Sequence, residues 1–97
     1  MFIRDSTIVV DLPHQPGALG NISSLIGINE GNILNVELLK KKKDYLQFSF
    51  DIQVKDLKNF TNLISEIKQN NYNFKIIRHK KKKNAFIRRI FENFKRN

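Results

Sequence analysis

The sequence contains no cysteine among its 97 residues, and it has only two prolines and four glycines. Without cysteine, a chain has neither a disulfide framework nor a thiolate metal site. A catalytic zinc normally needs three protein ligands, and the two histidines here, His14 and His79, lie far apart in the sequence. We therefore expect no metal and no other cofactor.

Long apolar runs are also missing. No stretch approaches the roughly 20 apolar residues that span a bilayer, and the first six residues lack the apolar centre of a signal peptide. We expect a cytoplasmic protein without a membrane partner. A chain of this length forms one small domain that buries only about 60 to 65% of its unfolded surface, so its compact core would gain from a partner.

Catalytic motifs are absent as well. The sequence has neither a phosphate-binding GxxxxGK[ST] loop nor a GxGxxG fingerprint, and no serine has a plausible base beside it. The carboxylates of Asp51, Asp56 and Glu66 are explained by the polar face of a strand, a helix cap and a helix surface. We predict no catalytic residue, so the chain is not expected to be an enzyme.

Acidic residues are few, nine against 18 Lys and Arg, and the excess of positive charge is uneven. Residues 80–97 hold eight Lys or Arg residues and a single Glu. A basic tail on a nearly neutral domain favours contact with a polyanion such as RNA. Coding composition is the alternative explanation, since Lys, Asn, Ile and Phe make up 46 of the 97 residues and all have A/T-rich codons.

The spacing of apolar residues predicts six elements in the order strand, helix, strand, strand, helix, strand. The strands are expected at 7–12, 33–39, 45–54 and 74–78, and the helices at about 17–30 and 57–70. Asp56 is the expected N-cap of the second helix, Gly31 the C-terminal glycine of the first, and residues 40–44 a hairpin turn. The two helices have these predicted apolar stripes: Leu19, Ile22, Leu25, Ile26 and Asn29; and Leu57, Phe60, Leu63, Ile64 and Ile67.

This order predicts an α+β, ferredoxin-like βαββαβ fold, with a four-stranded antiparallel sheet and both helices on one face. The first and third strands are expected in the centre and the other two at the edges. We assign residues 1–79 to this domain and residues 80–97 to a basic C-terminal tail, helical and amphipathic from about residue 84. Two roles are open for the tail. Its apolar stripe would pack on the domain or on a neighbouring chain, or the tail would bind RNA or an anionic membrane surface.

The stretch from Asp11 to Gly20 joins the first strand to the first helix through a turn containing Pro16 and Gly17. Such a turn leaves the amide groups of the helix N-terminus facing solvent, where they can hold a small anion such as an amino-acid carboxylate. The amides of Gly17, Ala18 and Leu19 are the candidates for that contact.

Two short motifs, Pro16-Gly17-Ala18-Leu19 and Gly31-Asn32-Ile33, resemble the ACT domain, a small regulatory module that usually senses amino acids. The longer stretches 17–35 and 50–64 resemble the C-terminal ACT domain of bacterial RelA/SpoT-type enzymes, which make and degrade (p)ppGpp. The resemblance covers about residues 6–78 and leaves out the tail.

The resemblance implies a regulatory part of a bifunctional (p)ppGpp synthetase/hydrolase, a GTP pyrophosphokinase of the stringent response, either separately encoded or part of a longer protein. It implies valine, isoleucine or leucine as ligand, held between the domains of a homodimer. Asn32 would bind an ammonium or carboxylate group. The expected ligand-binding residues are His14, Gln15, Gly17, Ala18, Leu19, Asn32 and Ile33, with His14 and Gln15 at the rim and Leu19 and Ile33 as an apolar wall.

Two alternatives stay open beside this hypothesis. The chain is an RNA or ribosome docking module, or it is a dimerisation module indifferent to ligands, in which Gly17 serves only the turn and Asn32 only satisfies loop amides. The possible RNA contacts are Lys40, Lys41, Lys42, Lys43, Lys80, Lys81, Lys82, Lys83, Arg88 and Arg89.

Overall fold

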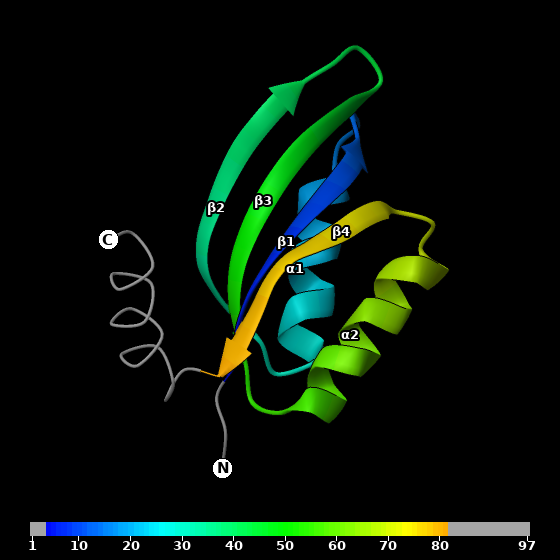
Figure 1. Ribbon diagram of the computed structural model, residues 1–97. Helices are drawn as coiled ribbons and strands as arrows, with labels where there is room; N and C mark the ends of the chain where they lie inside the picture. The colour runs from blue at the N-terminus through cyan, green and yellow to red at the C-terminus, as the bar shows by residue number, and fades with distance from the viewer. Residues whose placement is uncertain (1–3, 82–97) are drawn as a thin grey trace, which may run out of the picture.

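The computed structural model describes residues 4–81, with the surroundings of the side chains from Asp5 to Ile77. Four strands and two helices follow one another in the predicted order (Figure 1). They are β1 (Arg4–Pro13), α1 (Ala18–Ile28), β2 (Asn32–Lys41), β3 (Tyr45–Val54), α2 (Leu57–Gln69) and β4 (Asn73–Lys81).

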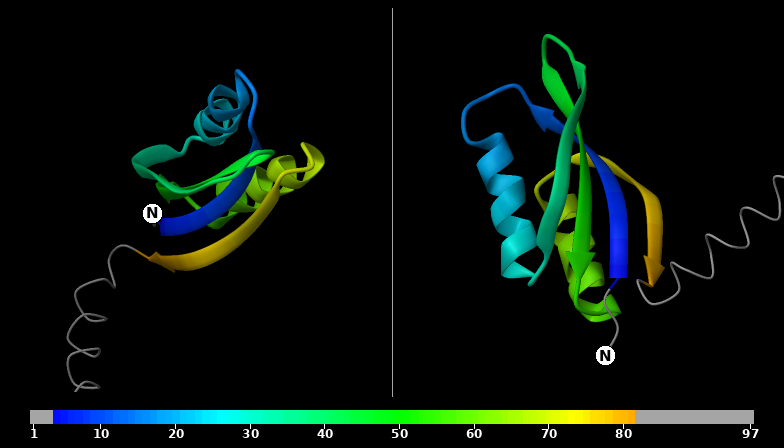
Figure 2. Two further views of the ribbon diagram at one scale, coloured as in Figure 1. Left: turned by 90° about the horizontal axis from the view of Figure 1, so that it is seen from above. Right: turned by 90° about the vertical axis from the view of Figure 1, so that its left-hand side faces the viewer.

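The strands form one sheet in the order β2-β3-β1-β4, and all neighbouring strands are antiparallel. Both helices cover the same face of this sheet, and the other face is open (Figure 2). The predicted ferredoxin-like α+β fold is therefore confirmed, including the central positions of β1 and β3 and the edge positions of β2 and β4.

The core lies between the sheet and the two helices. β1 and β3 alternate with a period of two, so that Ile8 pairs with Phe50 and both are fully buried under the helices. The other buried members of this cluster are Val10, Leu12, Ala18, Ile22, Ile26, Ile52, Val54, Phe60, Leu63 and Ile67.

Both predicted helix stripes are wrong at their first residue. α1 buries Ala18, Ile22 and Ile26, whereas the Leu19 side chain is 42% exposed. The other four predicted residues of the α1 stripe are buried or partly buried, and they are Ile22, Leu25, Ile26 and Asn29. In α2, Leu57 is the first residue of the helix and is 54% exposed.

The two helices end in the same way, with a left-handed residue that is not glycine. Glu30 has φ 59° after α1 and Asn71 has φ 62° after α2. After α1, the amide of Glu30 donates to Gly27 O and the amide of Gly31 to Ile26 O, each at 2.9 Å, which is the Schellman pattern. Gly31 thus follows the C-terminus of α1 as predicted, but Glu30 before it takes the left-handed conformation.

A glycine is needed at position 31 because a Cβ atom would be too close to its neighbours. A Cβ atom at this position would lie 2.9 Å from Cγ2 of Ile26 and 3.1 Å from its carbonyl oxygen. The predicted N-cap of α2 is confirmed, because Oδ1 of Asp56 accepts a 2.9 Å hydrogen bond from the amide of Asn59.

Polar contacts from both ends of α1 reach the carboxyl end of α2 and the turn that follows it. Asn29, only 8% exposed, donates from Nδ2 to the carbonyl of Leu25 at 2.8 Å and to Oε1 of Glu66 at 2.6 Å. Near the other end, Nδ2 of Asn21 donates to the hydroxyl of Tyr72 at 2.6 Å. Glu66 therefore lies on the α2 surface, as predicted, and also accepts a hydrogen bond from Asn29.

Three strands are longer than predicted. The backbone of β4 continues through Lys80 and Lys81, so the strand extends two residues into the segment that we assigned to the tail, and Lys40 and Lys41 belong to β2 and not to the hairpin turn. The predicted helix from about residue 84 lies outside the described residues.

Candidate ligand-binding turn and sheet edge

The turn between β1 and α1 depends on Gly17, which is the N-cap of α1 and has φ 86°. No side chain caps this helix. The amide of Asn21 donates to Gly17 O at 2.9 Å and that of Ala18 reaches Gln15 O at 3.5 Å, but the amides of Leu19 and Gly20 find no acceptor in the described part of the chain. The turn thus has free donors, as expected of a helix N-terminus.

The hairpin between β2 and β3 supports this turn from the side. The amide of His14 donates to the carbonyl of Asp44 at 3.2 Å, and the hairpin is closed by Lys42 N and Tyr45 O at 2.9 Å. Lys40, Lys41, Lys42 and Lys43 are all exposed. The free amides and four lysines therefore lie at the same end of the sheet, where the potential favours an anion.

The predicted ligand-binding residues lie at two opposite ends of α1. His14, Gln15, Gly17, Ala18 and Leu19 lie at its N-terminus, whereas Asn32 and Ile33 follow its C-terminus and begin β2. The two groups lie at opposite ends of α1, which has 11 residues and rises about 16 Å. One copy of the chain therefore does not bring all seven residues together.

Exposure separates these residues further. His14, Gln15, Gly17 and Asn32 are exposed, and so are Leu19 at 42% and Ile33 at 38%. Ala18 is different, because its side chain is buried at 7% and belongs to the core. Only the backbone of Ala18 is available to a ligand.

β2 is an edge strand whose ten residues are all exposed. The pairing of β2 with β3 shifts between Ile33 and Asn35 and again between Leu38 and Lys40, so that Leu34 and Leu39 are the extra residues. Its large apolar side chains are 38 to 56% exposed, and they are Ile33, Leu34, Val36, Leu38 and Leu39. Sequence reasoning missed this apolar edge, although a nearly continuous apolar run on a predicted edge strand was the signal for it.

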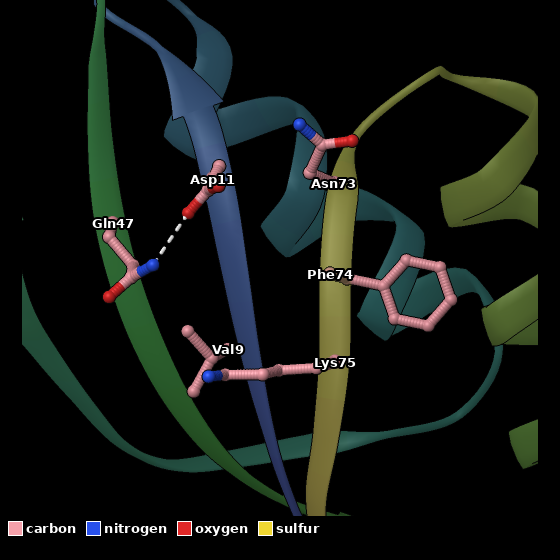
Figure 3. A pocket seen from close by; sticks show the side chains of 6 residues that line it. All are labelled: Val9, Asp11, Gln47, Asn73, Phe74 and Lys75. Atoms are coloured by element: carbon pink, nitrogen blue, oxygen red, sulfur yellow. Dashed lines mark hydrogen bonds between the residues drawn. The ribbon is translucent and has the colours of Figure 1, made fainter.

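The open face of the sheet carries a polar cavity of about 190 Å³ (Figure 3). Asp11 of β1 accepts a 2.9 Å hydrogen bond from Nε2 of Gln47 on β3, and Lys75 of β4 lies across Val9. Phe74 belongs to the other face, where it packs against the core. This cavity contains none of the predicted ligand-binding residues.

A larger cavity of about 510 Å³ adjoins the turn. Pro13 and Tyr45 line one side of it, and residues 70–73 between α2 and β4 line the other. Among residues 4–81, no group of three or more His, Cys, Asp or Glu side chains could hold a metal ion. In that same part of the chain, no helix is long and apolar enough to cross a membrane.

Comparisons with known proteins agree with this geometry. The sequence model of the ACT domain matches residues 4–78. The GTP pyrophosphokinases rsh of Brucella ovis and Brucella suis are each 31% identical over 62 residues, which are 64% of this chain and 8% of the relative. The chain therefore matches less than a tenth of the length of these relatives.

Two solved structures show the same fold. The ACT domain from GTP pyrophosphokinase of Chlorobium tepidum has a TM-score of 0.59 at 17% identity, over 77% of this chain and 86% of that one. Prephenate dehydratase from Streptococcus mutans has a TM-score of 0.65 at 21% identity, over 76% of this chain and 41% of that one. The family match spans nearly the whole described domain, and so this chain belongs to the ACT domain family.

Proposed function

We propose that this chain is the amino-acid-sensing regulatory domain of a cytoplasmic GTP pyrophosphokinase, and that two copies hold a branched-chain amino acid between them. The family match and the rsh relatives support the regulatory assignment. The observation that carries the ligand proposal is the turn at Gly17, where the amides of Leu19 and Gly20, which find no acceptor among residues 4–81, lie at the lysine-rich end of the sheet.

The turn supplies the carboxylate subsite. Gly17 has no Cβ, so a ligand can approach its backbone closely, and the amides of Leu19 and Gly20 are free to donate. The positive end of the α1 dipole and the neighbouring lysines both favour a negative group there. His14 and Gln15 form the exposed rim of this subsite.

The apolar edge of β2 is the proposed dimer contact. An exposed edge strand offers unpaired backbone groups, and a self-complementary interface forms readily around a two-fold axis. Between its two register shifts β2 has a regular segment, Asn35–Leu38, that can pair with the same segment of a second copy. Antiparallel pairing about this segment brings Asn32 of one copy beside Lys41 of the other.

That pairing would complete the site. Lys41 ends β2 at the same end of the sheet as the turn, so Asn32 and Ile33 of the second copy would approach Leu19 of the first. Asn32 would then bind the ammonium or carboxylate group of the ligand, and Leu19 and Ile33 would enclose a branched apolar side chain. The two halves of the site, at opposite ends of an 11-residue helix about 16 Å long, would meet only in the dimer.

A domain of this kind controls its parent enzyme when the ligand binds one state of the enzyme more tightly than the other. A ligand that prefers one state of the synthetase/hydrolase shifts the balance of the two activities by a coupling free energy of about 1 to 3 kcal/mol. The chain itself would have no catalytic role.

Isothermal titration of the chain with valine, isoleucine and leucine tests this function. We expect heat with at least one of them, and we expect Asn32→Ala to abolish it while Asn62→Ala, an exposed asparagine of α2 away from β2 and the turn, retains it. No heat at millimolar ligand would reject sensing by this domain. A stable dimer without any heat would favour the ligand-independent dimerisation module.

The exposed lysines of the β2–β3 hairpin support a second candidate function, RNA or ribosome docking. Phosphate contacts of this kind weaken steeply with salt because bound counterions are released. Binding of a structured RNA that falls with salt and is lost on deletion of residues 82–97 would favour this function. RNA binding that is unchanged by the deletion would leave the hairpin as the contact.

A further inference from the structure

An apolar groove of about 360 Å³ runs between α2 and β4, away from the ligand-binding turn and the β2 edge. α2 supplies most of its lining at helical spacing, on one stripe, and β4 supplies Ile76. The α2 residues that define it are Leu57, Phe60, Thr61, Ile64 and Ser65.

The walls of this groove are exposed apolar side chains. Leu57 is 54% and Ile76 44% exposed, whereas Phe60 between them is 6% exposed and forms the floor. The small side chains of Thr61 and Ser65 lie in the middle of the stripe, where they leave room for another backbone to approach. The groove therefore has the shape and chemistry to receive an amphipathic helix.

We propose that residues 84–97 of the same chain occupy this groove as a helix. β4 forms one wall of the groove, and its last residue, Lys81, lies at the end of the molecule where α2 begins (Figure 1). Residues 82–84 can span about 10 Å when extended, which is enough for the chain to reverse direction. The helix then runs back along α2.

The lengths of groove and segment agree. The stretch of α2 that lines the groove, from Leu57 to Lys68, covers 12 residues, a length of about 18 Å, and a helix over residues 84–97 is about 21 Å long. Its apolar residues recur at helical spacing and face one side, and they are Phe86, Ile87, Ile90, Phe91 and Phe94.

The charges at this end act in two ways. A helix that runs parallel to α2 places Lys95 and Arg96 near the carboxyl end of α2, where the helix dipole favours cations, but the Lys68 side chain of the groove is a like charge there. Arg88 and Arg89 fall beside the apolar stripe and remain in solvent, so the docked segment presents a basic outer surface. This arrangement does not depend on an amino-acid ligand.

Disulfide mapping in the full chain tests the proposal, because the natural sequence has no cysteine. The pair Thr61→Cys and Ile90→Cys joins the middle of the groove to the middle of the segment. Its control is Asn62→Cys with Ile90→Cys, since Asn62 is equally exposed on α2 but lies outside the groove. We expect the groove pair to form an intramolecular disulfide about tenfold faster than the control, because docking raises the effective concentration of the two thiols.

Gel electrophoresis without reductant and intact mass distinguish a disulfide within one chain, a disulfide between two chains and no disulfide. Equal rates for the two pairs, or no disulfide in either, would overturn the proposal. A disulfide that appears only between two chains would also overturn it and would place the segment in the groove of a second copy.

A fluorescence measurement checks the same contact without cross-linking. The chain has no tryptophan, so Phe91→Trp introduces a single reporter in the segment. We expect blue-shifted emission that moves to the red with Thr61→Lys and stays unchanged with Asn62→Lys. Emission typical of a fully solvated indole before any second substitution contradicts docking.

Discussion

At the scale of single residues, Gly17 and Gly31 are needed for different reasons. Gly17 has φ 86°, in the left-handed region that disfavours a Cβ, and nothing lies within 4 Å of the position that a Cβ would occupy. At Gly31 the backbone is not left-handed, but Ile26 leaves no room for a side chain. The first glycine therefore fixes the shape of the turn, and the second permits close packing between the end of α1 and β3.

Replacement of Gly17 by alanine should destabilise the domain. We expect the free energy of unfolding to fall by about 1 to 2 kcal/mol, the cost of a left-handed L-residue. Gly20→Ala is the control, since Gly20 lies inside α1 with open space around it, and it should raise stability by about 0.5 to 1 kcal/mol. Urea denaturation measures both, and equal effects of the two substitutions would contradict the special role of the turn.

At the scale of elements, α1 and α2 both follow their predicted apolar stripes except at the first residue. In each helix the other four predicted residues are buried or partly buried. α1 is apolar on several sides, and its orientation is set by contacts with the sheet and with α2. The hydrogen bond from Asn29 to Glu66 is one of these contacts, and it involves an amide that is 8% exposed.

The Asn29→Ala substitution should therefore cost more than a surface change. It leaves Glu66 without this donor at a partly buried position, and we expect a loss of about 1 to 3 kcal/mol. Asn21→Ala, which removes the exposed hydrogen bond to Tyr72 near the other end of α1, is the matched control and should cost less. Thermal unfolding measures both losses, since each kcal/mol lowers the Tm of a domain of this size by about 4 to 8 °C. A larger shift for Asn21→Ala would refute the argument from burial.

At the scale of the whole molecule, the two sheet edges are both apolar but have different proposed partners. On β2, Leu34 is 56% exposed at a register shift, and on β4, Ile77 is 56% exposed at another. We propose a second copy against β2 and the C-terminal segment in the groove between α2 and β4. The equal exposure of Leu34 and Ile77 makes them a matched pair for separating the two edges.

The Leu34→Asp substitution should dissociate the proposed dimer, because it places a charge on each side of the two-fold axis within the apolar contact. Sedimentation over a range of protein concentrations should give a monomer for this variant and a dimer for Ile77→Asp. We also expect Leu34→Asp to lose the heat of amino-acid binding, since the two halves of the site then remain apart. A variant that is monomeric but binds with unchanged heat would place the whole ligand site in one copy.

The sequence alone predicted the order of the elements, the central strands, the Asp56 cap and the turn at Pro16-Gly17. These features depend on local patterns, namely the period of two along β3 and the preferences of Asp, Pro and Gly at helix ends and turns. The motifs around Gly17 and Asn32 also resembled the family that the comparisons confirm.

Only the tertiary structure decided that Ala18 and not Leu19 faces the core, that Leu57 is exposed at the start of α2, and that all ten residues of β2 are exposed. The reason is that each depends on contacts between residues distant in the sequence. The packing of the helices on the sheet places Ala18 inside and Leu19 and Leu57 outside the core, and the exposure of β2 follows from its place at the sheet edge. Local preference determines which elements form, and packing determines which of their residues face solvent.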